Sequence, residues 1–355
     1  MDKFKAVEMS DEQKYFELAP GRNIENMSKL IKVPLGIAGP INGYQLPLAT
    51  TEGALVASVN RGCKAIRKSK GAEVKTELVG ATRGPVLRVK NLNEGRKVMK
   101  WVEENLGRLK KIAEQNEKHL KLLRIKPALV GRRIFLRLEF DTEEAMGMNM
   151  VTIATELVVK ELEKKLKVKT IALSGNYCVD KKPSWLNFIK GRGRKVWAEA
   201  VITNKAVKEI LKSSPEEIVE VVRSKQWLGS MMSGSMGFNA HFANVVAAMF
   251  LATGQDMAHV VEASMGVTTA EIDKKGLYFS IYLPSLMVGT IGGGTGLPVQ
   301  KKVLKGLGLG EVKKGDSDQL AKIIGLGVLA GELSLTAALA SGDLAKAHQR
   351  LGRGK

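Results

Sequence analysis

Two lysines and an aspartate within residues 174–182 (SGNYCVDKK) are residue types that can bind and polarise an anionic substrate. The preceding residues 168–173 are few and rich in β-branched types, which predicts a strand, and Gly175 and Asn176 end it. On the loop that follows, a lysine beside Asp180 can stay protonated and face a developing oxyanion, while a second lysine can pair with a substrate carboxylate. A solvated charged turn is the alternative for so few charges.

The composition describes a basic chain with a large core. Its 355 residues, 44% of them hydrophobic, are enough for two domains or for one domain with an insertion. The net charge of +20 favours polyanionic ligands such as nucleic acid, phosphorylated cofactors or acyl-CoA thioesters. Only 5% of the residues are aromatic, and lysines are spread along segments such as 103–126 and 160–169, which argues against a base-stacking surface.

Cysteine usage and hydropathy predict a soluble cytoplasmic protein. Cys63 and Cys178 are the only cysteines and have no metal-ligand spacing, so we expect neither a disulfide framework nor a metal site. Residues 1–16 contain acids and no apolar run, unlike a signal peptide. The longest apolar stretches, 245–252 and 323–330, are shorter than the ~20 residues that a spanning helix needs, so no membrane contact is expected.

The patterning predicts an α+β fold. Residues 1–20 are expected to form a helical arm, and an irregular stretch should follow to Thr51. Residues 52–68 have helical spacing, and their apolar side chains share one side. These side chains are Leu55, Val56, Val59, Cys63 and Ile66.

Residues 85–172 form a separate block. The expected order is strand 86–89, long basic helix 94–123, strand 133–139, helix 150–166 and strand 169–173. This pattern resembles a small ferredoxin-like split αβ sandwich, inserted into a larger α/β domain.

Seven motifs, in the same order along the chain, resemble those of the 3-hydroxy-3-methylglutaryl-CoA (HMG-CoA) reductase family. They are ATTEGALVASVNRGCKAI (49–66), ATRGP (81–85), EAMGMNM (144–150), SGNYCVDKKP (174–183), NAHFAN (239–244), GQD (254–256) and GTIGGGTGLP (289–298). The resemblance covers residues 18–353 and is to the soluble catalytic portion of the biosynthetic class of archaea and eukaryotes. It implies the four-electron reduction of HMG-CoA to mevalonate and CoA with two NADPH, in the mevalonate pathway of isoprenoid biosynthesis.

The resemblance also implies functional parts of the chain. The expected parts are a helical arm (1–20), a large HMG-CoA-binding domain (21–84 and 184–355), an inserted small NAD(P)H-binding domain (85–172) and a catalytic connecting loop (173–183). A homodimer with its active site at the subunit interface is expected, with a tetramer as the larger alternative.

Four catalytic residues carry over by motif match. Lys181 would stabilise the oxyanion, Asp256 would hold its ammonium, and Glu52 would donate a proton to the aldehyde oxygen. His348 would protonate the departing CoA thiolate. The structural alternatives are a helix-capping carboxylate for Glu52, a polar helix-end residue for Asp256 and an exposed tail residue for His348.

The remaining histidines are His119, His241 and His259. We expect His241, within NAHFAN, to orient backbone in a packed helix.

Binding residues carry over in three groups. The substrate contacts would be Arg83, Ser174, Asp180, Lys182, Lys225 and Asn244. The CoA contacts would be Ser58, Asn60, Arg61 and Lys64. The cofactor contacts would be Lys118, Glu144, Met146, Gly147, Met148, Asn149, Thr152, Gly292, Gly293 and Gly294.

Two departures from the family pattern concern the cofactor. Glu144 stands where an aspartate is usual, and Glu117 and Lys118 align with the Ser-Arg pair that often meets the 2′-phosphate of NADP. A carboxylate can instead bind the ribose hydroxyls of NADH, but lysines around a phosphate outweigh one mobile acid. The expectation is NADPH, with NADH as the alternative.

Two rival functions remain at this point. A degradative enzyme would oxidise mevalonate to HMG-CoA with NAD, and a basic nucleic-acid-binding protein would explain the charge. The HQRLGR element near the C-terminus favours the biosynthetic class, and the scarcity of aromatic residues argues against nucleic acid.

Overall fold

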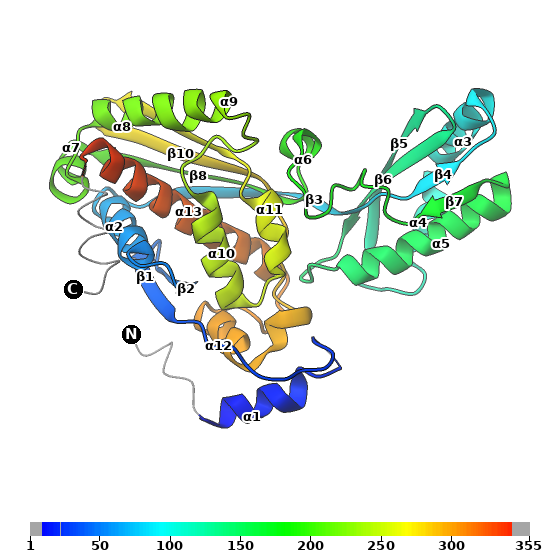
Figure 1. Ribbon diagram of the computed structural model, residues 1–355, viewed down its shortest axis with the longest axis horizontal. Coiled ribbons are helices and arrows are strands. Elements are labelled where there is room, and N and C mark those ends of the chain that lie inside the picture. Colours follow the sequence, from blue (N-terminus) through cyan, green and yellow to red (C-terminus); the bar gives the residue numbers. More distant parts are fainter. Residues whose placement is uncertain (1–8, 22, 343–355) are drawn as a thin grey trace.

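The computed structural model describes residues 9–21 and 23–342, which form a larger and a smaller lobe (Figure 1). The α-helices of the larger lobe are α1 (Met9–Leu18), α2 (Leu55–Lys68), α6 (Trp185–Lys190), α7 (Asn204–Ala206), α8 (Pro215–Val221), α9 (Ser230–Met232), α10 (Phe242–Thr253), α11 (Val260–Ala263), α12 (Pro298–Gly306) and α13 (Asp316–Ala340). Its strands are β1 (Leu35–Ile41), β2 (Tyr44–Ala49), β8 (Gly193–Thr203), β9 (Val267–Asp273) and β10 (Gly276–Leu286). The smaller lobe contains β4 (Val86–Arg88), α3 (Leu92–Glu104), α4 (Leu106–Glu114), β5 (Lys121–Val130), β6 (Arg133–Asp141), α5 (Met148–Leu166) and β7 (Lys169–Ala172).

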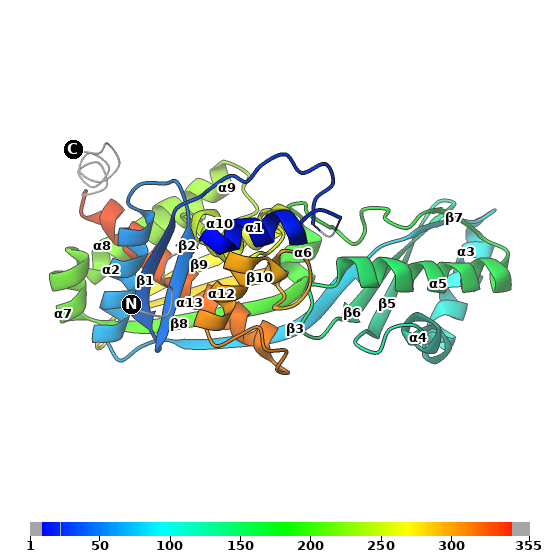
Figure 2. The ribbon, with the colours of Figure 1, turned by 90° about the horizontal axis from the view of Figure 1, so that it is seen from below.

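One long strand, β3 (Glu73–Arg83), joins the two lobes (Figure 2). Its first part pairs with β8 and its last residues pair with β6, so one sheet runs in the order β7-β4-β6-β3-β8-β10-β9. At the change of partner, Gly80 has a φ of +103°, and a Cβ there would lie 2.6 Å from the carbonyl oxygen of Phe140. Only glycine allows the two backbones to come this close. The change of partner places Arg83, the last residue of β3, at the junction of the lobes.

The smaller lobe confirms the ferredoxin-like prediction but corrects its elements. The predicted helix 94–123 is wrong, because α3 ends at Glu104, α4 ends at Glu114 and the chain then enters β5. The true order is β-α-β-β-α-β, with the four strands arranged β7-β4-β6-β5. The basic residues on β5 made this strand resemble a continuation of the basic helix; they are Lys121, Arg124 and Lys126.

The stretch predicted to be irregular before Thr51 contains the hairpin β1–β2. Ile41 pairs with Tyr44 across Asn42 and Gly43, which both have positive φ. Asn-Gly is the strongest short signal for a hairpin. The strands beside it were not predicted because prolines interrupt the sequence pattern there.

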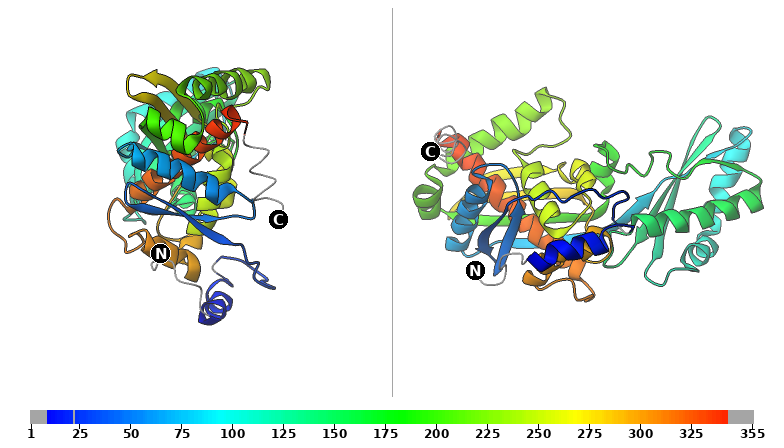
Figure 3. Two further views of the ribbon diagram at one scale, coloured as in Figure 1. Left: turned by 90° about the vertical axis from the view of Figure 1, so that its left-hand side faces the viewer. Right: turned by 60° about the horizontal axis from the view of Figure 1, so that its bottom comes forward.

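Helix α13 is the centre of the larger core and packs against α2, α10 and β8 (Figure 3, where it is coloured orange to red). The predicted apolar stripe of α2 is confirmed, since Leu55, Val59, Cys63 and Ile66 are buried there and the partly buried Val56 packs against the same core. Helix α13 has 25 residues and is apolar enough to cross a membrane by length and composition, but 83% of its most apolar window is buried inside the protein. The apolar run 323–330 is therefore part of this 25-residue helix, and its burial is that of a core helix.

A second, separate hydrophobic core fills the smaller lobe, between its sheet and α3, α4 and α5. The boundaries predicted at residues 85 and 172 stay a prediction.

Candidate active site

The loop after β7 is held by hydrogen bonds to its backbone. The carbonyl of Cys178 accepts from the Thr82 hydroxyl at 2.8 Å, and the carbonyl of Val179 accepts from the Asn187 amide at 2.8 Å. Lys181 has a φ of +57°, a conformation that costs ~1–3 kcal/mol when the residue is not glycine. The surrounding bonds fix this backbone and so aim the lysine.

Lys181 and Asp256 form an ion pair, with 2.7 Å between Nζ and Oδ2. Asp256 also begins the 3₁₀ turn Met257–His259, where its Oδ1 accepts from the N–H of Ala258 at 3.0 Å. Burial opposes ionisation of Asp256, but Lys181, the Ala258 N–H and the nearby His259 outweigh it, so its pKa lies below the ordinary value. The predicted pairing is confirmed. Asp256 is not the polar helix-end residue of the alternative, because α10 ends at Thr253 and Asp256 is the N-cap of the next turn.

Asp180 lies between two arginines. Its Oδ1 is 2.9 Å from Nη2 of Arg192, and its Oδ2 is 3.7 Å from Nη1 of Arg83. Arg83 also donates to the Thr152 hydroxyl at 2.6 Å, which ties β3 to helix α5. Arg83 is thus fixed by the protein and still faces the cavity described next.

A cavity of about 730 Å³ brings the predicted catalytic and cofactor segments together. Its lining includes Arg83, Asp180, Lys181 and Asp256. The same cavity is lined by residues 145–150 and by the glycine-rich segment 291–295. Met146, Gly147, Met148, Asn149 and Gly292–Gly294 are therefore placed beside the lysine, as predicted.

Close backbone packing assembles this cavity. The Gln255 side chain makes two hydrogen bonds to Gly289, donating to its carbonyl at 3.0 Å and accepting from its N–H at 2.9 Å. At Gly254, whose φ is +72°, a Cβ would lie 2.3 Å from the carbonyl oxygen of Gly294. Ala145 forms an isolated bridge with Ile291. Gln255 was missed by the sequence reasoning, although it lies within the GQD motif.

Glu144 does not line the cavity. Its buried carboxylate accepts 2.6 Å hydrogen bonds from the backbone N–H groups of Gly315 and Ser317, at the start of α13. The N-terminus of a helix favours such an anion. The predicted cofactor role of Glu144 is corrected to an anchor between the lobes.

The other two predicted cofactor residues also lie off the cavity. Thr152 donates to the carbonyl of Met148 inside α5, and it acts on the cavity only through Arg83. Lys118 is exposed on the turn between α4 and β5, beside Glu117 and the 2.7 Å hydrogen bond of His119 with Glu143.

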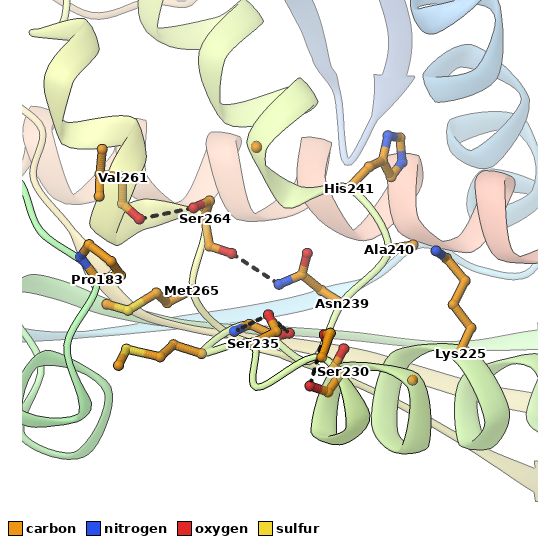
Figure 4. Close-up of a pocket in the computed structure, with 15 residues that line it drawn as sticks. Pro183, Lys225, Ser230, Ser235, Asn239, Ala240, His241, Val261, Ser264 and Met265 are labelled. Atoms are coloured by element: carbon orange, nitrogen blue, oxygen red, sulfur yellow. Dashed lines mark hydrogen bonds between the residues drawn. The ribbon is translucent and has the colours of Figure 1, made fainter.

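A second cavity, of about 590 Å³, is lined by Lys225, Asn239, His241 and Pro183 (Figure 4). His241 lies at the N-cap of α10 rather than within a helix, so our prediction for it is corrected. Its backbone N–H and that of Ala240 donate to the buried carboxylate of Glu332.

Glu52 is exposed near the second cavity, to which Asn244 and His241 connect it. Its Oε1 accepts from the Asn244 side chain at 3.2 Å, and Asn244 in turn is 3.4 Å from Nδ1 of His241. Ala54, not Glu52, is the N-cap of α2, and it has no side-chain cap, so the capping alternative for Glu52 is wrong. Within the described residues, Glu52 has no hydrogen bond or ion pair with Lys181 or Asp256.

The remaining predicted contacts have structural partners in the chain. Ser174 lies 3.5 Å from the Cys178 thiol, and the exposed Lys182 donates to the carbonyl of Asp180. Ser58 and Arg61 bond to Ser334 on α13.

Asn60 accepts from the Gly39 N–H, and Lys64 is exposed on α2. His348 lies outside the described residues.

Sequence reasoning missed a buried charged group behind Lys181. Asp180, His259 and Glu262 converge as metal ligands might, within 4.8 Å of one another. The guanidinium of Arg192 contacts all three, so an arginine occupies the position of a cation. The sequence gives no signal for this group, because its charged residues are isolated in the sequence and come together only from distant parts of the chain.

The ferredoxin-like lobe, the lysine–aspartate pair and the glycine-rich backbone on one cavity form an arrangement that suits the class of oxidoreductases with a dinucleotide cofactor. A family model described as hydroxymethylglutaryl-coenzyme A reductase matches residues 2–353. The chain belongs to this family, and it reduces HMG-CoA in the mevalonate pathway.

Similar proteins agree on this assignment. The 3-hydroxy-3-methylglutaryl-coenzyme A reductase of Methanocaldococcus jannaschii is 52% identical over 95% of this chain and 86% of its own length. That of Pyrococcus horikoshii is 50% identical over 96% and 86%. The class II reductase of Streptococcus pneumoniae, solved with NADPH in open conformations, shares the fold at a TM-score of 0.72, with 19% identity over 94% of this chain and 93% of that one. Neither mevalonate oxidation nor nucleic-acid binding is favoured by these relatives.

Proposed function

We propose that NADPH donates both hydrides in the reduction of HMG-CoA to mevalonate, at the cavity lined by Lys181 and Asp256. The observation that supports this most is the 2.7 Å ion pair, which lies on the same cavity as residues 145–150 and the glycine-rich segment. A positive group beside a dinucleotide site is what hydride transfer to a carbonyl requires.

The reaction then proceeds in two reduction steps. The first hydride attacks the thioester carbon, and the Lys181 ammonium stabilises the oxyanion. Collapse of this intermediate breaks the C–S bond, and His348 gives the CoA thiolate its proton. The second hydride attacks the resulting aldehyde, whose oxygen takes a proton from Glu52 to give mevalonate.

Backbone groups support dinucleotide binding at the cavity. Helix α5 begins after Gly147 with no side-chain cap, and residues 145–150 line the cavity. Uncapped N–H groups at a helix start attract phosphate, and a glycine turn lets backbone approach it. The 3₁₀ turn Gly293–Gly296 offers such a turn on the facing wall.

The preference for NADPH is proposed from charge on the smaller lobe. Lys118 and Lys121 are exposed beside the partly buried Glu117, which accepts from the His119 N–H. Comparing kcat/KM for NADPH and NADH tests this preference. We expect NADPH to be used at least about tenfold better, and Glu117→Ser to widen the ratio. A preference for NADH that Glu117→Ser reverses would show that Glu117 sets the choice.

We also propose a cytoplasmic homodimer whose subunits complete each other's sites. Apolar side chains are exposed on the segment 228–232, whose Gly229 and Ser230 line the second cavity; they are Leu228, Met231 and Met232, the last with 88% of its surface exposed. Such a patch is typical of a protein interface. Glu52 has no contact with Lys181 in its own chain within the described residues, which fits a site in which a partner's loop brings the lysine to the glutamate.

Complementation between inactive variants tests the shared site. Lys181→Ala and Glu52→Gln should each be inactive alone. If the sites are shared, a co-expressed mixture should recover about a quarter of the parental activity, because half of the dimers carry one intact site. No recovery in mixed dimers, demonstrated by two affinity tags, would place both residues in one subunit.

A further inference from the structure

His259, Glu262 and Arg192 form a fully buried group behind the ion pair of Lys181 with Asp256. Nδ1 of His259 is 2.7 Å from Glu262 Oε1 and 3.1 Å from Arg192 Nη1. Arginine only donates, so Nδ1 can serve only one of these neighbours. The shorter contact is to the carboxylate, which also accepts from Arg192, so Nδ1 carries a hydrogen that it donates to Glu262.

This arrangement leaves the other ring nitrogen facing the site. Nε2 of His259 is buried and has no hydrogen-bond partner among the described residues. It lies 3.7 Å from Asp256 Oδ2, the oxygen that binds Lys181. That distance is about 0.5 Å beyond a hydrogen bond. Buried nitrogens rarely lack a hydrogen-bond partner, so we expect Nε2 to make a hydrogen bond in another state of the enzyme.

Carboxylates surround the His259 ring. Three carboxylates lie within 4 Å of it, from Asp180 at 3.9 Å, Asp256 at 3.7 Å and Glu262 at 2.7 Å. The facing cations are Arg192 and, beyond Asp256, Lys181. Carboxylate oxygens therefore face both ring nitrogens, Glu262 at Nδ1 and Asp256 at Nε2.

We propose that His259 is a positioning residue of the reductase reaction, held by Glu262 with a hydrogen on each ring nitrogen, so that Nε2–H takes over Asp256 when Lys181 turns to the substrate. When the oxyanion forms, the Lys181 ammonium donates to it and its bond to Asp256 lengthens. Asp256 keeps the Ala258 N–H on Oδ1 and receives His259 on Oδ2. The carboxylate stays charged and in place for the second hydride. This inference rests on the roles proposed above for Lys181 and Asp256.

The proposed role of His259 can be told apart from that of His348. His259 acts through Lys181, which faces the substrate oxygen in both reduction steps. His259→Gln should lower kcat about tenfold for both HMG-CoA and free mevaldehyde, with both KM values unchanged within about twofold. A thiolate acid would affect only the thioester. His119→Gln is the matched control, since His119 is an exposed histidine that pairs with Glu143, and it should match the parent. Parental kcat for His259→Gln on both substrates would overturn the proposal.

Glu262→Gln provides the second variant. If Glu262 acts through His259, Glu262→Gln should lower kcat in the same way, and the double variant should be no slower than the slower single variant. Fully additive losses would mean independent structural effects and would also overturn the proposal.

A direct measurement needs no folded variant of the buried group. The chain has four histidines, so ¹⁵N-histidine spectra of the parent are simple to assign by replacing the other three. We expect the buried ring to carry a hydrogen on each nitrogen at pH 7. A neutral ring, with a hydrogen on only one of its nitrogens, would contradict the proposed arrangement. If Lys181→Ala is fully active, the proposed function fails; if it is inactive while His259→Gln is normal, only this inference fails.

Discussion

The ammonium of Lys181 meets the carboxylate of Asp256 at 2.7 Å, and each residue sits on backbone that other contacts have already fixed. Lys181 lies on a loop tied down through Cys178 and Val179, and Asp256 caps the turn that follows the Gly254 contact. Fixed backbone keeps the side chains within reach of a developing charge. The backbone positions of both residues are therefore set before substrate arrives, and the lysine side chain stays free to turn to it.

Asp256→Asn should keep the cap but lose the charge beside Lys181. The asparagine oxygen can still accept from the Ala258 N–H, so folding should be retained. We expect kcat to fall about 10²-fold, since the ammonium is no longer held. Asp273→Asn is a matched control, because Asp273 also accepts a backbone N–H in an exposed turn. Steady-state rates with NADPH check both, and equal rates would refute the role of Asp256.

The depressed pKa of Asp256 predicts the direction of a pH effect. A carboxyl whose folded pKa lies below its unfolded value adds stability above the unfolded pKa, about 4, and loses it as pH falls through the folded pKa. Thermal unfolding of the parent and of Asp256→Asn should therefore differ by a constant amount above about pH 5 and converge in more acidic buffer. A difference that grows on acidification would contradict this sign.

Glu144→Gln should weaken the join between the lobes. The amide cannot accept from both Gly315 and Ser317 with two oxygens, and its NH₂ would face an N–H group. We expect a loss of about 1–3 kcal/mol in the free energy of unfolding. Glu143→Gln, at a neighbouring exposed position, should lose less than about 0.5 kcal/mol. Urea unfolding measures both values, and similar losses would argue against the anchor.

Gly254→Ala should disrupt the cofactor wall. The new methyl would lie 2.3 Å from the Gly294 carbonyl, at a φ that disfavours any side chain. The glycine-rich segment must then move, so NADPH should bind at least about tenfold more weakly. Gly107→Ala, in α4 with nothing within 4 Å of the added methyl, should bind NADPH normally. Fluorescence titration with NADPH compares the two variants.

Periodicity and motifs predicted the parts of the chain whose signals are local. The stripe of α2 and the loop with Lys181 follow directly from residue spacing. Strand β5 was missed because lysines and an arginine hide its alternation, and β3 because its two sets of partners lie in different lobes. The exchange of partner at Gly80 depends on tertiary contacts that no local pattern encodes.

The site was predictable only where a motif marks it. Lys181 and Asp256 were placed correctly together, since their motifs are specific. Glu144 was assigned to the cofactor because the motif names it, but the helix that it anchors begins far along the chain. Arg192 and Glu262 carry no motif, and their pairing depends on burial that only the fold creates.

The most direct test of the central claim is the turnover of Lys181→Ala with HMG-CoA and NADPH. Lys190→Ala on α6 is the matched surface control, and thermal unfolding and NADPH binding verify that the variant folds. We predict a fall in kcat of at least about 10²-fold for Lys181→Ala, with the control and the folding measurements unchanged. Turnover near the parental value in a folded Lys181→Ala enzyme would contradict the account.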